Sequence, residues 1–360
     1  MLKMVNKITV NEGKANELII NVVNSITINS TYDKFTDTAE ILFPENINFN
    51  GKNIFTGRDA LIKRNDSIKI ELGYDTLKPI FKGYITKVGS SNPIKIECED
   101  QMFLLKKVIV THPDPSDVKV ITKSKTGRAL KKPINITEPI LLSQLLDHII
   151  PDEINYKIIV SNSTGSGTTD DVNLGSFVAT KVSVTEILNT LKDVYGLYSY
   201  FKDDVLFVGL PNDASDSKTE NFTFEENIID GTTLEYQQAD DIHTKVVAIS
   251  MNEDNTKKQI EVGDKDGSQR TYYTYNANEE ELKIFANAKL NEVKYTGYFG
   301  KFKTFGEPYV RHGDIAKITS KKFSEQDGFY QIVGVQYNWD TSEGYTRDID
   351  IGQFLGKSLS

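Results

Sequence analysis

The sequence contains few residues of the kinds that form covalent links or bind metals. Its 360 residues include one cysteine and four histidines. A single cysteine excludes an intrachain disulfide framework, and the place of Cys98 in an alternating apolar run predicts a small buried side chain rather than a reactive thiol. The histidines are His112, His148, His243 and His312, which form neither an HExxH motif nor a short ligand pair. We therefore expect no metal site.

Long apolar segments are absent as well. No stretch approaches the roughly 18 apolar residues of a membrane-spanning helix, and residues 1–14 lack the apolar core of a signal peptide. The sequence therefore predicts a soluble protein made in a reducing compartment, without a membrane partner. Its net charge of −9 disfavours tight binding to a nucleic-acid backbone, because such binding depends on clustered cations.

Signatures of catalysis are missing too. No GxSxG, Walker or dinucleotide-binding motif occurs, and Ser166 lies in a polar loop rather than at a strand-to-helix turn. The segment 263–267 has too few oxygen ligands for a calcium loop, so it is interpreted as a hairpin turn around Asp266. Asp203 and Asp204 are the best candidates for a catalytic carboxylate pair. At a hairpin tip both would be exposed to water, so neither would have the raised pKa that acid catalysis needs. We expect no catalytic, cofactor-binding or metal-binding residue, no cofactor and no enzymatic activity.

Two stretches have alternative interpretations. The basic stretch 123–132 either contacts phosphate or an acidic partner, or is an exposed loop, which is the favoured interpretation. An aromatic run at 295–305 either stacks on bases or sugars, or lies on the core side of strands. Its rings are Tyr295, Tyr298, Phe299, Phe302 and Phe305. Their largely alternating spacing favours the core.

Period-two apolar patterns dominate the two ends of the chain. Residues 1–106 alternate repeatedly between turn residues, which predicts an antiparallel barrel or sandwich. The pattern returns over 229–360, with one packing helix capped by Asn278. Residues 107–228 mix helices and strands. The expected fold class is mainly β with an inserted α/β domain: a first β-barrel at 1–106, the α/β domain at 107–228 and a second β-barrel at 229–360.

The middle segment carries explicit signals for local structure. A helix is expected from Thr137 to a stop at Pro151. Ser183 and Glu186 have the spacing of a capping box, and Gly196 follows the last apolar turn of that helix as a left-handed stop. A hairpin with its turn at 202–204 is predicted next.

One pattern occurs near each end of the chain and is the most informative feature of the sequence. Each copy contains a charged turn, a strand, a variable loop and a second strand that opens with glycine and an aromatic residue. The first copy consists of Arg64, Asp66, Ile68, Ile70, Phe81, Gly83, Tyr84, Ile85 and Val88. The second consists of Arg311, Asp314, Ile315, Ile318, Gly328, Phe329, Tyr330, Ile332 and Val335. The repetition predicts two similar β domains in one chain, so that a ring of three chains would present six.

Five segments, from three regions of the chain, resemble a known family. FGEPYVRHGDIAKI, DGFYQIVGVQYNWD and GYTRDIDIG, all within 305–352, resemble the closing domain of phage tail baseplate hub proteins of the late-control-protein-D type, which are related to the hub portion of type VI secretion spikes. IFKGYITKV at 80–88 resembles the first domain of these hubs, and residues 184–209 resemble their inserted α/β domain.

The resemblance implies a function without catalysis. It implies a homotrimer whose two tube-type barrels per chain form a pseudo-sixfold ring, which joins the tail tube protein to a separate spike or tail-tip protein. The expected location is the virion tail, baseplate or tip, of a phage, a prophage or a contractile injection system, after synthesis in the bacterial cytoplasm. DNA would only pass through the lumen. The alternative is a carbohydrate-binding or carbohydrate-cleaving tail-tip protein that uses the aromatic run and a carboxylate pair.

Overall fold

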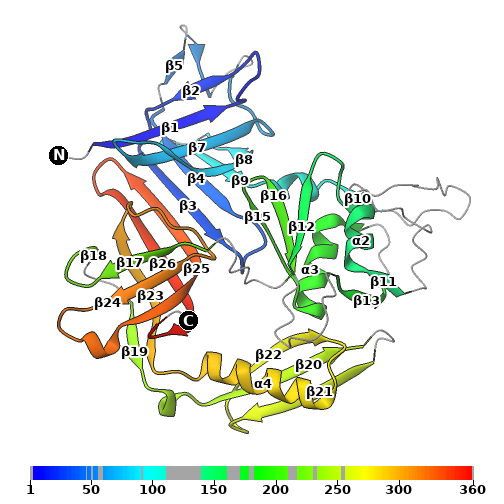
Figure 1. Cartoon of the computed structure of the whole chain (residues 1–360). Coiled ribbons are helices and arrows are strands. Elements are labelled where there is room, and N and C mark those ends of the chain that lie inside the picture. The colour runs from blue at the N-terminus through cyan, green and yellow to red at the C-terminus, as the bar shows by residue number, and fades with distance from the viewer. Residues whose placement is uncertain are drawn as a thin grey trace, which may run out of the picture. The chain divides into compact units, whose positions relative to one another are not determined.

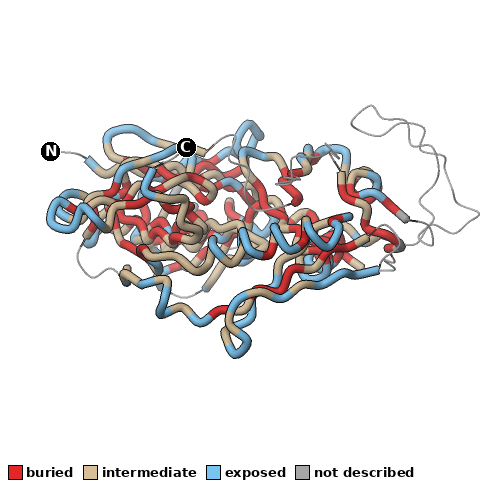
Figure 2. The backbone as a smooth tube through the Cα atoms, turned by 60° about the horizontal axis from the view of Figure 1, so that its bottom comes forward, coloured by how far each residue is buried: buried red, intermediate tan, exposed pale blue. Residues whose placement is uncertain are grey.

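The computed structural model describes residues 3–45, 47–49, 52–55, 60–90, 92–110, 139–159, 171–177, 182–209, 217–229, 233–252 and 256–358. The fold is mainly β, as expected. Buried, intermediate and exposed residues alternate along much of the backbone (Figure 2). The chain divides into two compact units, neither of which is continuous in sequence. Unit 1 comprises residues 1–103, 216–236 and 298–360, and unit 2 comprises 104–215 and 237–297.

Unit 1 is built on one large sheet. Its N-terminal strands are β1 (Met4–Val10), β2 (Leu18–Ile20), β3 (Ser25–Thr31), β4 (Thr38–Phe43), β7 (Ser67–Tyr74), β8 (Lys78–Val88) and β9 (Ile94–Glu99). A separate two-stranded ribbon is formed by β5 (Asn48–Phe49) and β6 (Lys52–Asn53). In the large sheet these strands lie in the order β2-β1-β7-β8-β9-β4-β3, all antiparallel. Their alternating side chains fill the core, in which Cys98 is buried, as predicted.

The remaining strands of unit 1 extend this sheet. They are β17 (Thr219–Thr223), β18 (Ile228–Ile229), β19 (Glu235–Gln237, whose last residue falls in unit 2), β23 (Gly297–Phe305), β24 (Ile315–Thr319), β25 (Gly328–Asp340) and β26 (Gly344–Gly356). The order is β17-β24-β25-β26-β23-β18, and β25 also pairs with β3 (Figure 1).

The two halves of unit 1 share one topology. We call β1, β3, β4, β7, β8 and β9 the first repeat, and β17, β18, β23, β24, β25 and β26 the second repeat. Taken in sequence order, each strand of the first repeat has a counterpart in the second, and both sets have the same spatial order. The one difference of direction is that β1 runs antiparallel to β7, whereas β17 runs parallel to β24. The predicted duplication is therefore present in the structure.

Unit 2 contains the helical part of the chain. Its strands are β10 (Ile109–Val110), β11 (Pro139–Leu141), β12 (Asn155–Ile159), β13 (Asn173–Ser176), β14 (Val182–Ser183), β15 (Tyr198–Lys202) and β16 (Val205–Gly209). Its first helices are α2 (Leu142–Ile149) and α3 (Val184–Tyr195), and a short helix α1 (Met102–Leu105) lies at the unit boundary. The strands β12, β16 and β15 form a small mixed sheet.

Local signals in this unit were interpreted correctly at α3. The Ser183 hydroxyl accepts from the Glu186 N–H, the Glu186 carboxylate accepts from the Ser183 N–H, and Gly196 has φ +67°. The predicted β15–β16 hairpin is present, with Asp203 and Asp204 at positive φ. The helix expected from Thr137 was placed too early. It begins at Leu142, because Pro139–Leu141 pair with β13 as a strand.

The second part of unit 2 is a three-stranded sheet covered by a helix. The strands are β20 (Thr244–Met251), β21 (Lys257–Gly263) and β22 (Ser268–Tyr275), and the helix is α4 (Glu279–Val293). Asn278 caps α4 as predicted, and the buried Leu282 and Ala286 pack against the sheet. This helix belongs to unit 2, although the sequence placed it within the second barrel domain.

The turn at 263–267 is not a hairpin turn. The strands β21 and β22 lie on opposite sides of β20, so the turn crosses the start of β20. The Asp264 N–H donates to the Thr244 carbonyl, and the Ser268 N–H donates to the His243 carbonyl. The prediction failed because a short turn does not reveal whether its flanking strands pair with each other or with a third strand.

Candidate assembly interface

An aspartate turn opens the central hairpin of each repeat. The Lys63 N–H donates to Asp66 Oδ2 at 2.7 Å, and the Arg311 N–H donates to Asp314 Oδ2 at 2.9 Å. The aspartate N–H in turn donates to the carbonyl of Lys63 or Arg311, at 3.2 Å in both repeats. The structure therefore aligns Arg311 with Lys63, one residue away from the Arg64 that the sequence pattern suggested.

The same turn fastens the next strand. The Ile85 N–H donates to the Asp66 carbonyl at 2.9 Å, and the Ile332 N–H donates to the Asp314 carbonyl at 2.8 Å. The residue before each aspartate has positive φ, +75° at Asn65 and +87° at Gly313, a conformation that asparagine and glycine adopt most easily. If Ile85 is equivalent to Ile332, then Tyr84 is equivalent to Gln331. The glycine–aromatic pairs of the two sequence copies are therefore not at equivalent positions.

Both repeats contain the same β-bulge immediately after this isoleucine. The register pairs Ile85 with Cys98 and Lys87 with Glu97 in the first repeat, and Ile332 with Ile351 and Gly334 with Asp350 in the second. The extra residue is Thr86 in one and Val333 in the other. A bulge bends its strand and ends regular pairing, so each repeat has a built-in site at which β8 or β25 leaves one neighbour.

In the second repeat, a strand of the first repeat occupies the edge beyond the bulge. The strand β25 pairs with β24 only up to Gln331, and Gly334–Asp340 then pair with Thr31–Ser25 of β3. The Thr31 hydroxyl donates to the carbonyl of the bulged Val333 at 2.9 Å. We call this contact the internal joint.

The internal joint is apolar on its buried face. Val335, Tyr337 and Trp339 of β25 are buried, and so are Ile26 and Ile28 of β3. Tyr337 lies opposite Ile28 and Trp339 lies opposite Ile26. Such cross-strand pairs of aromatic and β-branched residues stabilise a sheet contact, so the two repeats are fixed edge to edge.

At the equivalent edge of the first repeat the structure contains a groove. Beyond the bulge, Val88 has no strand partner on the side away from β9 among the residues described. The groove beside it is lined by the turn and the strand end, including Phe55, Ile62, Arg64 and Gly89. The Gly89 N–H donates to the Lys95 carbonyl of β9 at 2.7 Å. Because strand residues alternate in direction, the N–H and carbonyl of Val88 point to the open edge.

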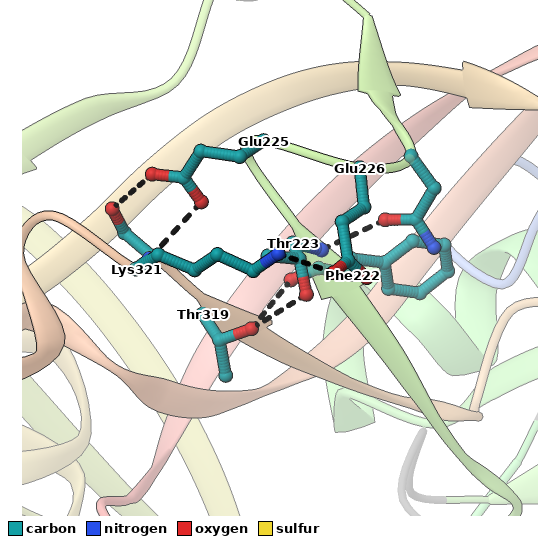
Figure 3. A network of polar contacts seen from close by, with 8 residues as sticks. Phe222, Thr223, Glu225, Glu226, Thr319 and Lys321 are labelled. Carbon is teal, nitrogen blue, oxygen red and sulfur yellow. Dashed lines mark hydrogen bonds and ion pairs between the residues drawn. The ribbon is translucent and has the colours of Figure 1, made fainter.

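A polar network holds β17 in its parallel position (Figure 3). The Thr223 and Thr319 hydroxyls lie 2.9 Å apart at the ends of β17 and β24. The Glu225 carboxylate accepts from the Lys321 N–H, and the Lys321 Nζ lies 2.7 Å from Glu226. The hydrogen bond from Lys321 lowers the pKa of Glu225. These contacts belong to the second repeat alone and accompany its one difference in strand direction.

A pair of carboxyl groups lies beside the internal joint. The Asp37 carboxylate accepts from the Ser30 hydroxyl at 2.6 Å and from the Thr31 N–H at 3.0 Å. The Asp37 N–H donates to Asp100 Oδ2 at 3.2 Å. Burial raises the pKa of Asp37 from 3.8 to about 7, and burial together with the nearby Asp37 raises the pKa of Asp100. These two carboxyl groups were not singled out in the sequence, where neither forms part of a motif.

A buried cation on β26 lies beside the middle of the joint, where Arg347 is paired with Tyr337 of β25. The Arg347 side chain is fully buried, and its Nε donates to the Phe305 carbonyl at 3.0 Å. Its two terminal nitrogens have no hydrogen-bond partner in the described part of the protein. Burial lowers the pKa of Arg347. The equivalent position in the first repeat is Ile94, which is buried as well.

The aromatic run does not form one exposed surface. Tyr298 and Phe302 are buried, whereas Phe299 and Phe305 are exposed. The Tyr298 hydroxyl donates to Gln326 at 2.7 Å, and the Tyr298 N–H donates to the Tyr330 hydroxyl. The core interpretation therefore holds for Tyr298 and Phe302. The basic stretch 123–132 and Ser166 lie outside the described residues.

His112 lies outside the described residues, and the other residues weighed for metal binding and acid catalysis form no cluster. Asp203 and Asp204 are exposed at their hairpin tip. His312 is buried 6.3 Å from the Tyr32 ring, whereas His148 lies on α2 in unit 2. Within the described ranges, no group of three or more histidine, cysteine or carboxylate side chains is placed to hold a metal. No helix among those residues is long and apolar enough to cross a membrane.

Comparisons with known proteins identify the fold. No protein-family model matches the sequence, and no curated protein matches it. A tail protein from Neisseria meningitidis superposes with a TM-score of 0.58 at 14% identity, covering 96% of both chains. A 43 kDa tail protein of prophage MuSo2 from Shewanella oneidensis gives 0.55 at 12% identity, covering 96% of this chain and 97% of that one.

A third solved structure gives the same result. A prophage tail protein from Listeria monocytogenes superposes with a TM-score of 0.53 at 12% identity, covering 96% of this chain and 94% of that one. The chain therefore has the fold of these phage tail proteins, over nearly its whole length. The resemblance that the sequence suggested is confirmed at the level of the fold.

Proposed function

We propose that this chain is a structural hub of a phage or phage-derived tail. In this proposal three copies form a ring in which six similar repeats surround a pore, so that a threefold object matches a sixfold tail tube. The ring joins the tube protein on one side to a separate spike or tip protein on the other. The single observation that carries the proposal is the internal joint, because it already connects two repeats of identical strand order edge to edge.

We propose domain bounds on the basis of the repeats. In this proposal the first tube-type domain lies within residues 1–106, and the inserted α/β domain lies within residues 107–215, which belong to unit 2. The second tube-type domain is formed by the second repeat within 217–360. The segment 237–297 is inserted between β18 and β23, where the first repeat has only the connection 32–37 between β3 and β4. The ring would be built by the repeats, and both insertions would lie outside the repeated strands.

The role proposed is mechanical rather than enzymatic. The side chains that define the joint are apolar or bound to backbone groups, as expected for a permanent contact. Obligate subunit interfaces commonly bury more than about 2,000 Å² with an apolar centre. A carbohydrate-binding role would use Tyr298 as a stacking platform, but this ring is 6% exposed and hydrogen-bonded. The proposed location is the tail of the virion, with DNA passing through the pore.

Measurement of the oligomeric mass tests this function. The chain has a mass of 40.5 kDa, and light scattering should give about three times that value at high protein concentration. A pull-down with a tail tube protein should recover a complex. A chain that remains monomeric and also fails to bind the tube protein would contradict the proposal.

A further inference from the structure

We infer that the loop 320–327, between β24 and β25, binds the spike or tip protein and not the tail tube protein. This inference rests on the proposed function and names the part of the chain that contacts one of the two partners. Its basis is that the loop is found in the second repeat alone, has a backbone fixed by hydrogen bonds and exposes the apolar ring of Phe323.

The two repeats differ in length at this connection. In the second repeat β24 and β25 are joined by residues 320–327, which include a 3-10 turn at Ser324–Gln326. In the first repeat the equivalent strands β7 and β8 are joined by residues 75–77 only. That turn is tight, because the Thr76 carbonyl packs so closely against Gly73 that a side chain there would collide with it. The loop therefore occurs once in each chain.

The number of loops indicates the symmetry of the partner. In a ring of three chains, features common to both repeats recur six times, whereas the loop 320–327 recurs three times. A sixfold tube presents six identical surfaces, and half of them would face a repeat that lacks the loop. A threefold partner presents three surfaces, each of which would meet one loop. Of the two partners in the proposed function, the spike or tip protein is the one that is not the sixfold tube.

Hydrogen bonds fix the backbone of the loop. The Ser320 hydroxyl accepts from the N–H groups of Lys322 and Phe323, both at 3.2 Å. The Ser320 N–H donates to Asp327 Oδ1 at 2.9 Å, which closes the base of the loop. The Gln326 N–H donates to the Phe323 carbonyl at 2.9 Å. The conformation of the backbone that carries the Phe323 ring is therefore already set.

A second turn of the same repeat supports the loop from the side (Figure 3). This turn joins β17 to β18 and contains Glu225 and Glu226. The Glu225 carboxylate accepts from the Ser320 hydroxyl at 2.9 Å and from the Lys321 N–H at 3.0 Å. The Lys321 Nζ lies 2.7 Å from Glu226. The network that holds β17 in its parallel position therefore also stiffens the loop.

The Phe323 side chain contributes little to this loop. Its ring is 53% exposed, and the hydrogen bonds of this residue are made by its backbone N–H and carbonyl, which any residue could supply. An aromatic ring on a fixed backbone binds a partner protein at a small cost in conformational entropy, and such rings are common anchors of interfaces. The exposed ring therefore suits a pocket in a partner protein.

The lysine beside the ring indicates the chemistry of that pocket. Lys322 is exposed, and its ammonium group forms no ion pair among the residues described. An ammonium group next to an apolar anchor favours a carboxylate at the rim of the partner's pocket. The partner surface that fits the loop is therefore an apolar pocket with an acidic rim.

Substitution of the ring tests the assignment. Phe323→Ala removes the exposed ring and keeps every backbone hydrogen bond of the loop, so the variant should fold and self-associate like the natural chain. We expect its affinity for the purified spike or tip protein of the same tail to fall at least about tenfold. Its affinity for the tube protein should not change. Biolayer interferometry measures both affinities, and circular dichroism confirms folding.

The matched control lies in the equivalent turn of the first repeat. Leu77→Ala removes another exposed apolar side chain, which is 39% exposed in the natural chain. It should bind the tube protein and the spike or tip protein as the natural chain does. A loss of spike binding in Leu77→Ala as large as that in Phe323→Ala would contradict the inference, because the binding would then not be specific to the second repeat.

Two further variants test the fixed backbone and the acidic rim. Ser320→Ala keeps the ring and removes the acceptor of the Lys322 and Phe323 N–H groups, so it should bind the spike or tip protein about threefold more weakly. Lys322→Glu reverses the charge beside the ring and should slow association with this partner about tenfold at low salt. Binding of both variants at the natural rate and affinity would contradict the pocket described above.

The outcomes separate this inference from the function on which it rests. A natural chain that binds both partners, with Phe323→Ala binding the spike or tip protein equally well, would overturn the assignment of the loop and leave the hub in place. Phe323→Ala that loses the tube protein and keeps the spike or tip protein would overturn it as well. A natural chain that is monomeric at every concentration and binds neither partner would overturn both.

Discussion

The two repeats of unit 1 have the same strand order but carry different additions. The first repeat has a connection of six residues, 32–37, between β3 and β4, whereas the second has the segment 237–297 at the equivalent point. The β25 edge of the second repeat is filled by β3, whereas the β8 edge of the first borders a groove. Both keep the aspartate turn and the bulge. The comparison shows that the turn and the bulge are the features common to both repeats. The connections between strands tolerate large insertions, because the entropy cost of closing a loop rises slowly with its length.

The largest expected effect tests whether the repeats are equivalent at their centre. Ile85 and Ile332 are both fully buried beside the bulge. Ile85→Ala and Ile332→Ala should each lower the free energy of unfolding by about 2 to 5 kcal/mol, through lost burial and the cavity left behind. Denaturant unfolding monitored by fluorescence measures both. Losses that differ by more than about 2 kcal/mol would show that the two positions are not equivalent.

The aspartate turns should respond unequally. Asp314 is 2% exposed and accepts from both Arg311 and Lys218, whereas Asp66 is half-buried and accepts from Lys63. Asp314→Ala should cost about 2 to 3 kcal/mol, because it leaves two partly buried N–H groups without their acceptor, and Asp66→Ala about 1 kcal/mol. Asparagine at either position should recover part of the loss. Thermal unfolding measures both variants. Equal losses of stability would show that the deeper burial of Asp314 does not increase the cost of its removal.

The pH dependence of stability should also distinguish the repeats, because the buried pair Asp37 and Asp100 belongs to the first repeat. Burial raises the pKa of Asp37 from 3.8 to about 7, so the folded protein binds a proton that the unfolded chain releases. Its contribution to stability is fully present below about pH 4 and is lost as the pH rises to about 7. The variant Asp37→Asn should flatten the pH dependence of unfolding over this interval. If the free energy of unfolding of the variant depends on pH as in the natural chain, a group other than Asp37 is responsible for the dependence.

The smallest effect concerns the buried cation of the second repeat. Arg347→Ile installs the residue type found at the equivalent position, Ile94. Because the terminal nitrogens of Arg347 are buried and have no acceptor among the described residues, its removal should leave stability unchanged or raise it by about 1 kcal/mol. Calorimetry measures the change. A loss of more than about 2 kcal/mol would indicate that the guanidinium stabilises the aromatic residues around it.

Local features of the fold were predictable because their causes lie close together in the sequence. The Ser183 and Glu186 cap, the Gly196 stop and the turn at Asp203 each depend on a few neighbouring residues. The repeat was also visible, since Asp66 and Asp314 stand at the same distance from a strand. The register was predicted only in part. The equivalent residues of β8 and β25 are Ile85 and Ile332, and not the conspicuous glycine–aromatic pairs.

Features that depend on distant pairing were not predictable. Nothing in residues 237–297 indicates that their strands leave the second repeat for unit 2, because alternation marks a strand and not its partner. The pairing of β25 with β3 joins residues about 300 positions apart. The candidate interface could therefore not be predicted from the sequence pattern. The bulge after which β25 pairs with β3 does lie within the repeated motif.

Single-particle imaging of the purified protein at high concentration is the most direct test of the central claim, that duplicated repeats allow three chains to match a sixfold tube. The account predicts threefold particles whose end views show six similar lobes around a central hole, with the two repeats of each chain related by a turn of about sixty degrees. Particles that contain three lobes, or a ring in which the two repeats do not share the pore, would contradict it.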